Sequence, residues 1–466
     1  MKSLFLITLF LTFSHFRAHS LESSDLQKIV KSYGIPESRL GLHVLDLNQI
    51  PHKTIFEVRS EIQMIPASLS KIFTAVAALK KFGPSYKLKT SLWSLSLPQD
   101  GLLKGDLYLK GGGDPGFVSE TMWFLVNEFT RNEVTKIDGD IIVDESFFDS
   151  VRFDESRDPG RVDRAYDAPI GAMSFNWNSI SVYARPTQVG KGPKIFLNPD
   201  NGAWKITNMA KTKKGNGSSI LVSRVGADTI YVTGKIGQKT DEVVKYKSIL
   251  HPAIWSGNNL KDFLSQRGIQ VTGEVKVGKV PPAARLVAEA EGKPMRETVS
   301  DMMKFSNNYV AEMITKNLAA KFRKQPGTMS DGVSVIIDAI NELGVASKDF
   351  RLINPSGLSR ENKFKAKDMN HILSEAYGAF SYSSEFLSSL PLAGVDGTLK
   401  SRMKGSAATG RVRAKTGMLT GVAGLAGYAG RKDGQVYAFT FMFNGPGPQG
   451  DLARRLFDDL AAELVK

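Results

Sequence analysis

Hydrophobic and polar residues alternate differently in three successive stretches of the 466-residue chain, and the first stretch joins strands to a helix. Residues 41–46 and 54–58 alternate with a period of two, which predicts half-buried strands. The run 68–80 repeats its apolar residues at helical spacing, and the pair Gly83-Pro84 follows it. We therefore expect a pair of strands and then a helix at the start of the domain.

The stretch from about residue 86 to residue 290 is richer in strands. Its short apolar runs are separated by glycine-rich turns, a pattern typical of strands and hairpins, and they lie in 105–116, 138–149, 219–237 and 270–280. The glycines at 111–113 are interpreted as a turn, because no Lys-Ser or Lys-Thr pair follows at the spacing of a phosphate-binding loop.

Helices return after about residue 295. Residues 308–322 carry apolar side chains at helical spacing, and the last segment, 451–466, has a leucine every four residues. Between them, 419–430 and 436–444 have the character of strands joined by a polar turn. Helix-rich ends around a strand-rich middle favour one α/β domain built from both ends of the chain.

We expect this domain, of α+β type, to comprise residues 21–85 and 290–466. Residues 86–289 would then form a β-rich insertion, which is long enough for one or two domains.

The first twenty residues differ from the rest of the chain. Lys2 precedes an apolar run, and Ala18 and Ser20 have the spacing that a signal peptidase recognises. We interpret residues 1–20 as a signal peptide, with an uncleaved anchor as the alternative. A mature chain beginning near Leu21 would be secreted across the inner membrane into the periplasm.

Composition narrows the possible chemistry and the possible partners. The chain has no cysteine, which excludes thiol catalysis and cysteine-ligated metals. Its net charge of +14 favours acidic partners, which outside the cytoplasm are wall polymers or lipid headgroups rather than nucleic acid. The alternative interpretation is that the charge serves only general solubility. We expect at most peripheral membrane contact. No metal or cofactor is expected, since no close ligand pair occurs among His43, His52, His251 and His371.

Motifs with nucleophilic and cationic residues occur in one order, Ser68-Leu69-Ser70-Lys71, Ser306-Asn307-Asn308 and Lys415-Thr416-Gly417. In the first, residues three apart share a helix face, so the Ser68 hydroxyl and the Lys71 amine can meet. A serine needs a neighbouring base to become nucleophilic, and a lysine serves when burial and positive charge lower its pKa. We therefore expect Ser68 to be the nucleophile and Lys71 its base.

Each motif alone is a weak signal, because residues 401–404 also fit S-x-x-K and S-x-N recurs at 174–176 and 256–258. Only Ser68 precedes an S-x-N and then a K-T-G. The K-T-G opens a predicted strand pair, where Gly417 would let a substrate lie against an edge strand.

The chain resembles the D-alanyl-D-alanine carboxypeptidase/endopeptidase family of the penicillin-binding protein 4 type, peptidase family S13. The resemblance covers essentially the whole mature chain and rests on PASLSKIFTAVAAL, KFSNNYVAEM, LPLAGVDGTLKSRM and RVRAKTGMLTGVAGLAGYAG. It implies a serine β-lactamase/D,D-peptidase-like domain with an antiparallel sheet flanked by helices. It also implies peptidoglycan stem peptides as substrates and β-lactams as inhibitors.

The resemblance assigns the acyl-transfer roles to the matching motif residues. Ser68 attacks the carbonyl of the penultimate D-alanine, and Lys71 takes its proton. Ser306 relays a proton to the leaving amine, while Asn308 holds the substrate backbone and Lys71. Lys415 adds positive charge that keeps Lys71 neutral.

The carboxylate and oxyanion contacts are also implied. Thr416, beside Gly417, holds the terminal carboxylate, and the backbone N–H groups of Ser68 and Met418 form the oxyanion hole. Arg360 is a candidate for binding a carboxylate of the substrate stem.

One stretch departs from the family pattern, which usually reads Asp-Gly-Ser-Gly-Leu. Here it reads Asn354-Pro355-Ser356-Gly357-Leu358. The change leaves the motif residues intact. It puts in doubt whether this part of the site has the substrate preference of the family.

Other readings use the same motifs. A class A β-lactamase needs a glutamate for deacylation and lacks the insertion, and a cross-linking transpeptidase usually keeps an anchor and an N-terminal module. A catalytically inactive wall-binding protein would have lost a motif residue. Carboxypeptidase and endopeptidase action share one acyl chemistry, and the motifs do not separate them.

Overall fold

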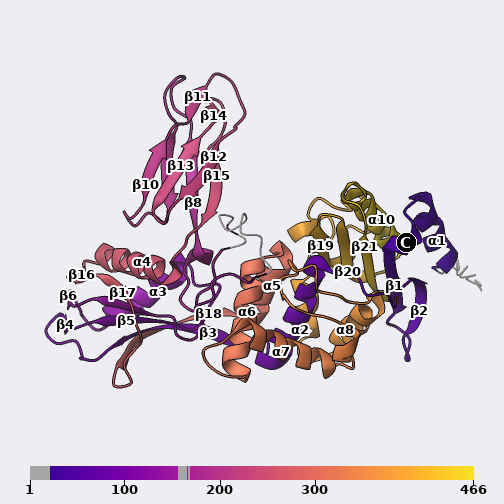
Figure 1. The fold of residues 1–466 in the computed structure, drawn as a ribbon, viewed down its shortest axis with the longest axis horizontal. Coiled ribbons are helices and arrows are strands. Elements are labelled where there is room, and N and C mark those ends of the chain that lie inside the picture. Colours follow the sequence, from indigo (N-terminus) through magenta and orange to yellow (C-terminus); the bar gives the residue numbers. More distant parts are fainter. Residues whose placement is uncertain (1–20, 156–164, 166–167) are drawn as a thin grey trace, which may run out of the picture.

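The computed structural model describes residues 21–155, 165 and 168–466 (Figure 1). The expected signal peptide, residues 1–20, lies outside the described residues. Within the described part of the chain, no helix is long and apolar enough to cross a membrane.

A five-stranded antiparallel sheet joins the two ends of the chain (Figure 1). Its strands, in spatial order, are β19 (Val412–Leu419), β20 (Val422–Gly430), β21 (Val436–Asn444), β1 (Leu40–Asp46) and β2 (Lys53–Val58). The predictions of strands at 41–46, 54–58 and 436–444 are confirmed. The predicted strand 419–430 begins only at Val422, because the preceding residues belong to a separate strand, β19.

Helices cover both faces of this sheet. One face carries α1 (Ser23–Ser32) and α10 (Gly450–Glu463), which share an apolar core with the sheet. The other face carries the helices that surround the motif residues, α2 (Lys71–Phe82), α5 (Met295–Phe305), α6 (Asn308–Phe322), α7 (Met329–Asn341), α8 (Ala366–Gly378) and α9 (Ser383–Ser389). The predicted antiparallel sheet flanked by helices is confirmed, as is the helix 308–322.

The middle of the chain forms a second apolar core. Its main sheet has the order β17 (Val275–Val277), β7 (Ile141–Asp144), β5 (Leu107–Gly111), β3 (Lys87–Ser94) and β18 (Arg285–Pro294). A small neighbouring sheet contains β16 (Gln270–Val271), β6 (Lys136–Asp138) and β4 (Leu102–Lys104). The expected boundaries of the insertion, residues 86 and 289, stay a prediction. Strand β18, which pairs with β3, crosses the second boundary and extends to Pro294.

The remaining strands form an arm above this sheet in Figure 1. They are β8 (Ser179–Arg185), β9 (Lys194–Asn198) and β15 (Val243–Ser248) in one sheet, β10 (Lys205–Asn208), β12 (Leu221–Val225) and β13 (Thr229–Thr233) in another, and the pair β11 (Lys211–Lys213) and β14 (Lys235–Gly237).

The predicted strands are present in all four stretches of the middle of the chain, and 219–237 contains the antiparallel hairpin β12–β13, but two features were not predicted. Helices α3 (Ser119–Thr130) and α4 (Pro252–Gln266) pack on its main sheet. Several strands also pair in parallel with distant partners, as β5 does with β7 and β7 with β17, rather than forming hairpins.

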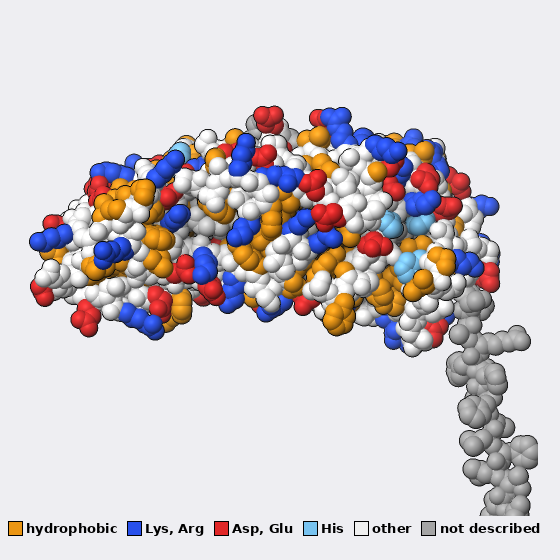
Figure 2. Space-filling view, turned by 90° about the horizontal axis from the view of Figure 1, so that it is seen from below, with side chains coloured by type: hydrophobic (Ala, Val, Ile, Leu, Met, Phe, Trp, Pro, Cys, Tyr) orange, Lys and Arg blue, Asp and Glu red, His pale blue; other side chains and the backbone are white. Residues whose placement is uncertain are grey.

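The basic residues do not form one dominant patch on the visible face in Figure 2. Lysine and arginine side chains are interspersed there with aspartate and glutamate. On this face, the distribution is typical of a mixed, solvated surface.

Candidate active site

Ser68 lies in the short 3-10 helix Ala67–Ser70, immediately before α2. Lys71 is the first residue of α2 and is fully buried, since the apolar residues that follow it pack into the core. Its Nζ donates to Ser68 Oγ at 3.1 Å, as the i, i+3 spacing predicts, and to Asn308 Oδ1 at 2.7 Å. The structure thus places a buried amine against the hydroxyl predicted to be the nucleophile.

Ser306 reaches the site because the chain turns sharply between α5 and α6. Ser306 follows α5 in the left-handed conformation, with φ 54°, and the Asn307 side chain then caps α6 by accepting from the Val310 N–H at 3.2 Å. The turn directs the Ser306 hydroxyl toward Lys415, whose Nζ donates to it at 2.8 Å. Asn308, in the first turn of α6, faces Lys71.

The K-T-G residues lie inside β19, the first strand of the antiparallel pair β19–β20, which begins three residues before Lys415. Lys415 pairs with Ala426 of β20. On the outer edge of β19, the Ala414 N–H donates to the carbonyl of Pro391 at 2.9 Å. Alternate residues of a strand point the same way, so the N–H groups of Thr416 and Met418 also face this edge. A substrate backbone could pair there.

Lys415 is fully buried beside a second amine. Burial and the positive charge of Lys71 lower the pKa of Lys415 well below its usual range. Mutual repulsion therefore disfavours the state in which both lysines are charged. The expectation that Lys71 is the neutral member stays a prediction.

A cavity of about 360 Å³ opens over Ser68. It is lined by Ser68, Ser306, Thr398, Ser401, Arg402, Thr416, Gly417, Met418 and Arg454. Five residues predicted from the motifs thus share one cavity, while Lys71, Asn308 and Lys415 lie buried behind it.

Four residues of this cavity, Thr398, Ser401, Arg402 and Arg454, were not predicted as functional. Thr398 accepts a hydrogen bond from Thr416 Oγ1 at 3.0 Å, which orients the hydroxyl expected to hold a carboxylate. Ser401 was considered only as an alternative nucleophile, but Lys404, its partner in the second S-x-x-K, is exposed. Thr398, Ser401 and Arg402 lie in LPLAGVDGTLKSRM, so the resemblance of that stretch to the family was the signal that could have identified them.

The loop that departs from the family pattern contacts the nucleophile and its base. The Ser356 carbonyl accepts from Lys71 Nζ at 2.5 Å and from Ser68 Oγ at 3.4 Å. The side-chain oxygen of Asn354 accepts from the N–H groups of Ser356 and Gly357 at 2.9 and 3.0 Å. An asparagine oxygen thus holds this turn against the active site.

Arg360 does not lie among the residues that line the cavity over Ser68. Its guanidinium donates to the carbonyl of Thr420 at 2.5 Å, just beyond the end of β19. Its contact with a stem carboxylate stays a prediction.

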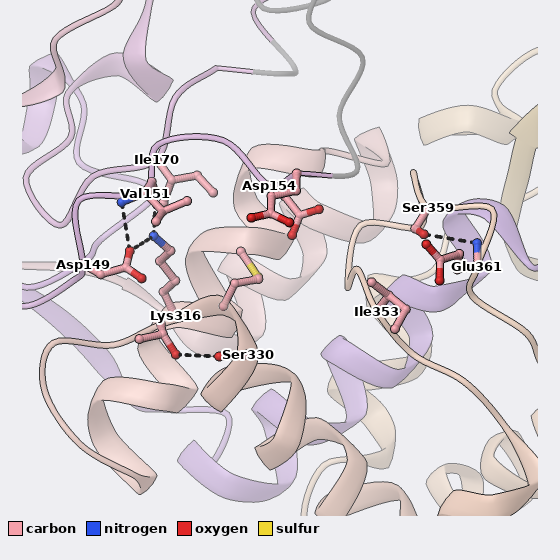
Figure 3. Close-up of a pocket in the computed structure, with 12 residues that line it drawn as sticks. Asp149, Val151, Asp154, Ile170, Lys316, Ser330, Ile353, Ser359 and Glu361 are labelled. Atoms are coloured by element: carbon pink, nitrogen blue, oxygen red, sulfur yellow. Dashed lines mark hydrogen bonds and ion pairs between the residues drawn. The ribbon is translucent and has the colours of Figure 1, made fainter.

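A second cavity, of about 530 Å³, lies between the insertion and the loop after Ser356 (Figure 3). The side chains of Asp149, Asp154 and Glu361 surround it. Lys316 Nζ, almost fully buried, donates to Asp149 Oδ1 and, at 2.6 Å, to the carbonyl of Val151. This ion pair ties α6 to the insertion.

Comparisons with known proteins agree on one family. The model of the D-Ala-D-Ala carboxypeptidase 3 (S13) family matches residues 22–464. A D-alanyl-D-alanine carboxypeptidase of an Actinomadura strain is 32% identical over 420 residues, covering 87% of this chain and 77% of the relative. DacB of Haemophilus influenzae, also a D-alanyl-D-alanine carboxypeptidase, is 26% identical over 443 residues, covering 88% and 86%.

Solved structures show the same fold. Penicillin binding protein 4 of Haemophilus influenzae superposes with a TM-score of 0.77 at 24% identity, covering 94% of this chain and 99% of that one. A predatory endopeptidase of Bdellovibrio bacteriovorus, solved with penicillin G attached, has a TM-score of 0.54 at 16% identity and covers 91% of each chain.

Proposed function

We propose that Ser68 is the nucleophile of this enzyme. The chain belongs to the D-Ala-D-Ala carboxypeptidase 3 (S13) family and is a serine D,D-peptidase inhibited by β-lactams. One observation carries this assignment. The Ser68 hydroxyl, paired with the buried Lys71 amine, opens into the same cavity as Ser306 and the K-T-G strand.

Acylation follows from these contacts. Lys71 Nζ takes the proton of Ser68 Oγ as the oxygen attacks the carbonyl carbon of a D-alanyl residue. The N–H groups of Ser68 and Met418 stabilise the resulting oxyanion. The amide C–N bond then breaks, the proton held by Lys71 passes through Ser306 to the leaving nitrogen, and Ser68 remains esterified with Lys71 neutral again.

Deacylation reverses the use of the base. A water molecule gives a proton to Lys71 Nζ while its oxygen attacks the ester carbonyl. The C–O bond to Ser68 breaks, Ser68 Oγ recovers a proton from Lys71, and the shortened peptide leaves as an acid. A β-lactam forms the corresponding ester, but its ring-opened leaving group stays attached and hinders the entry of water.

Thr416 and Arg360 complete the proposed substrate contacts. The Thr416 hydroxyl, oriented by Thr398, holds the carboxylate next to the scissile bond. Arg360, beyond the end of β19, binds a carboxylate of the stem peptide. We also propose that residues 1–20 direct secretion and that the enzyme acts on peptidoglycan in the periplasm.

The test is covalent labelling of the purified mature protein. Incubation with benzylpenicillin should add one inhibitor mass to the wild type and none to Ser68→Ala. A persistent adduct on Ser68→Ala would move the nucleophile elsewhere, with Ser401 as the first residue to examine. Rapid release of penicilloate would instead indicate β-lactamase turnover, and a folded wild type that leaves the drug intact would indicate a wall-binding protein.

A further inference from the structure

We propose that Arg402 and Arg454 form a second anion-binding position on the leaving-group side of the active site, used by leaving groups larger than D-alanine. The inference rests on the proposed function and adds specificity-determining residues to it.

The size of the cavity motivates the proposal. Its volume of about 360 Å³ falls in the range of roughly 300–1,000 Å³ that holds drug-sized ligands. A single D-alanine is far smaller, and its one carboxylate is assigned above to Thr416, which Thr398 orients. That assignment leaves Arg402 and Arg454, on the remaining wall, without a ligand.

Arg454 presents part of its guanidinium at this wall. Its Nη1 donates to Asp451 at 2.8 Å, while its Nη2 makes no hydrogen bond to a described residue and the side chain is 37% exposed. An anion in the cavity can therefore accept a hydrogen bond from Nη2.

Arg402 is held rigidly next to it. Its Nε donates to Asp458 Oδ1 at 3.1 Å and its Nη2 to the same oxygen at 2.7 Å. Its side chain is only 12% exposed. Because Asp458 occupies the Nε–Nη2 edge of the planar guanidinium, Nη1 is the arm that can reach an anion in the cavity.

Both arginines line the cavity over Ser68, whereas Arg360, proposed to bind the stem peptide, does not. Arg402 lies in the turn that follows Thr398, and Arg454 lies on α10, which packs on β20 and β21. The cavity therefore brings Ser68 and Thr416 together with the two arginines.

A cross-linked wall peptide matches this geometry chemically. Its leaving group is a diamino acid within a second stem peptide, and that stem carries carboxylates further from the scissile amide. The carboxylate next to the cleaved bond would lie at Thr416. A more distant one would lie between Arg402 and Arg454.

The test compares substrates within one enzyme preparation. Rates (kcat/KM) would be measured for a single stem peptide ending in D-Ala-D-Ala and for a cross-linked dimer. In Arg454→Gln, the dimer-to-monomer ratio of kcat/KM should fall about tenfold, mainly through KM. Arg454→Lys, which keeps the charge but loses the second guanidinium arm, should fall in between. Arg455→Gln, an exposed neighbour on α10, should keep the wild-type ratio.

The outcomes separate the subsite from the proposed function. An unchanged ratio in both Arg454 variants, or equal losses on both substrates, would overturn the proposal. Benzylpenicillin labelling of each variant reports whether Ser68 remains competent. A wild type that is neither labelled nor active on either peptide would refute the proposed function itself.

Discussion

Replacing Gly357 by alanine should disable acylation while leaving most of the fold in place. Gly357 has φ +85°, a conformation that side chains with Cβ rarely adopt. A Cβ built there would lie 2.0 Å from the carbonyl oxygen of Ala67 and 2.8 Å from the backbone nitrogen of Ser68. Both contacts are with backbone, so no flexible side chain can move aside.

Two effects set the magnitude of the change. The left-handed conformation costs a residue with Cβ roughly 1–2 kcal/mol of folding free energy. Relieving the 2.0 Å contact requires the loop or the nucleophile helix to move by about 1 Å, and a displacement of that size can lower a rate about a hundredfold. The same shift would separate the Ser356 carbonyl from Lys71.

The assay is the second-order rate of benzylpenicillin acylation, followed by intact mass, alongside thermal unfolding. Gly378→Ala is the matched control, because Gly378 has no positive φ and a Cβ there meets nothing within 4 Å. A Gly357→Ala enzyme that acylates at the wild-type rate would refute the argument that this loop positions Ser68.

Three further predictions test the site and the buried charges. Lys71→Met should lower the rate of acylation by benzylpenicillin at least a thousandfold, because Ser68 loses its base. Single-turnover mass measurements give this rate, and near-normal labelling would exclude Lys71 as the base. Thr398→Val removes the 3.0 Å hydrogen bond to Thr416, so KM for a D-Ala-D-Ala peptide should rise about tenfold while thermal stability stays unchanged. An unaltered KM would show that Thr416 binds the carboxylate without being oriented by Thr398. Burial raises the pKa of Asp114 to about 6, so the folded state holds this proton more tightly than the unfolded state and loses stability as pH rises through 6. Asp114→Asn should therefore raise the unfolding free energy by about 2–3 kcal/mol at pH 8 and by much less at pH 4. Urea titration at the two pH values measures this, and an equal gain at both would contradict the raised pKa of Asp114.

The acyl site could be predicted where its geometry is local. Ser68 and Lys71 meet because helical spacing brings i and i+3 together, and the helix ends where Gly83 takes φ 83°. The boundaries of the helix 308–322 were predicted correctly, since its apolar periodicity is strong.

The missed features depend on contacts between distant parts of the chain or on weak local patterns. In α3, Trp123 and Phe124 are about half exposed, which blurs the apolar stripe that marks a helix. In α4, Gly257 is a poor helix former. Arg454 joins the cavity over Ser68 only through the tertiary fold, so no local pattern could identify it.

The order of strands in the five-stranded sheet delays activity until the chain is complete. Strand β21 is the last to be synthesised, yet it lies in the interior of the sheet, between β20 and β1. Pairing Val44 with Phe439 closes a loop spanning most of the sequence, at an entropic cost of about 5 kcal/mol. Until β21 arrives, the N-terminal hairpin β1–β2 has no strand that joins it to β20. A fragment released before this strand would contain the motif residues without the connection between the two ends of the sheet, so we expect hydrolysis to begin only after β21 has been added.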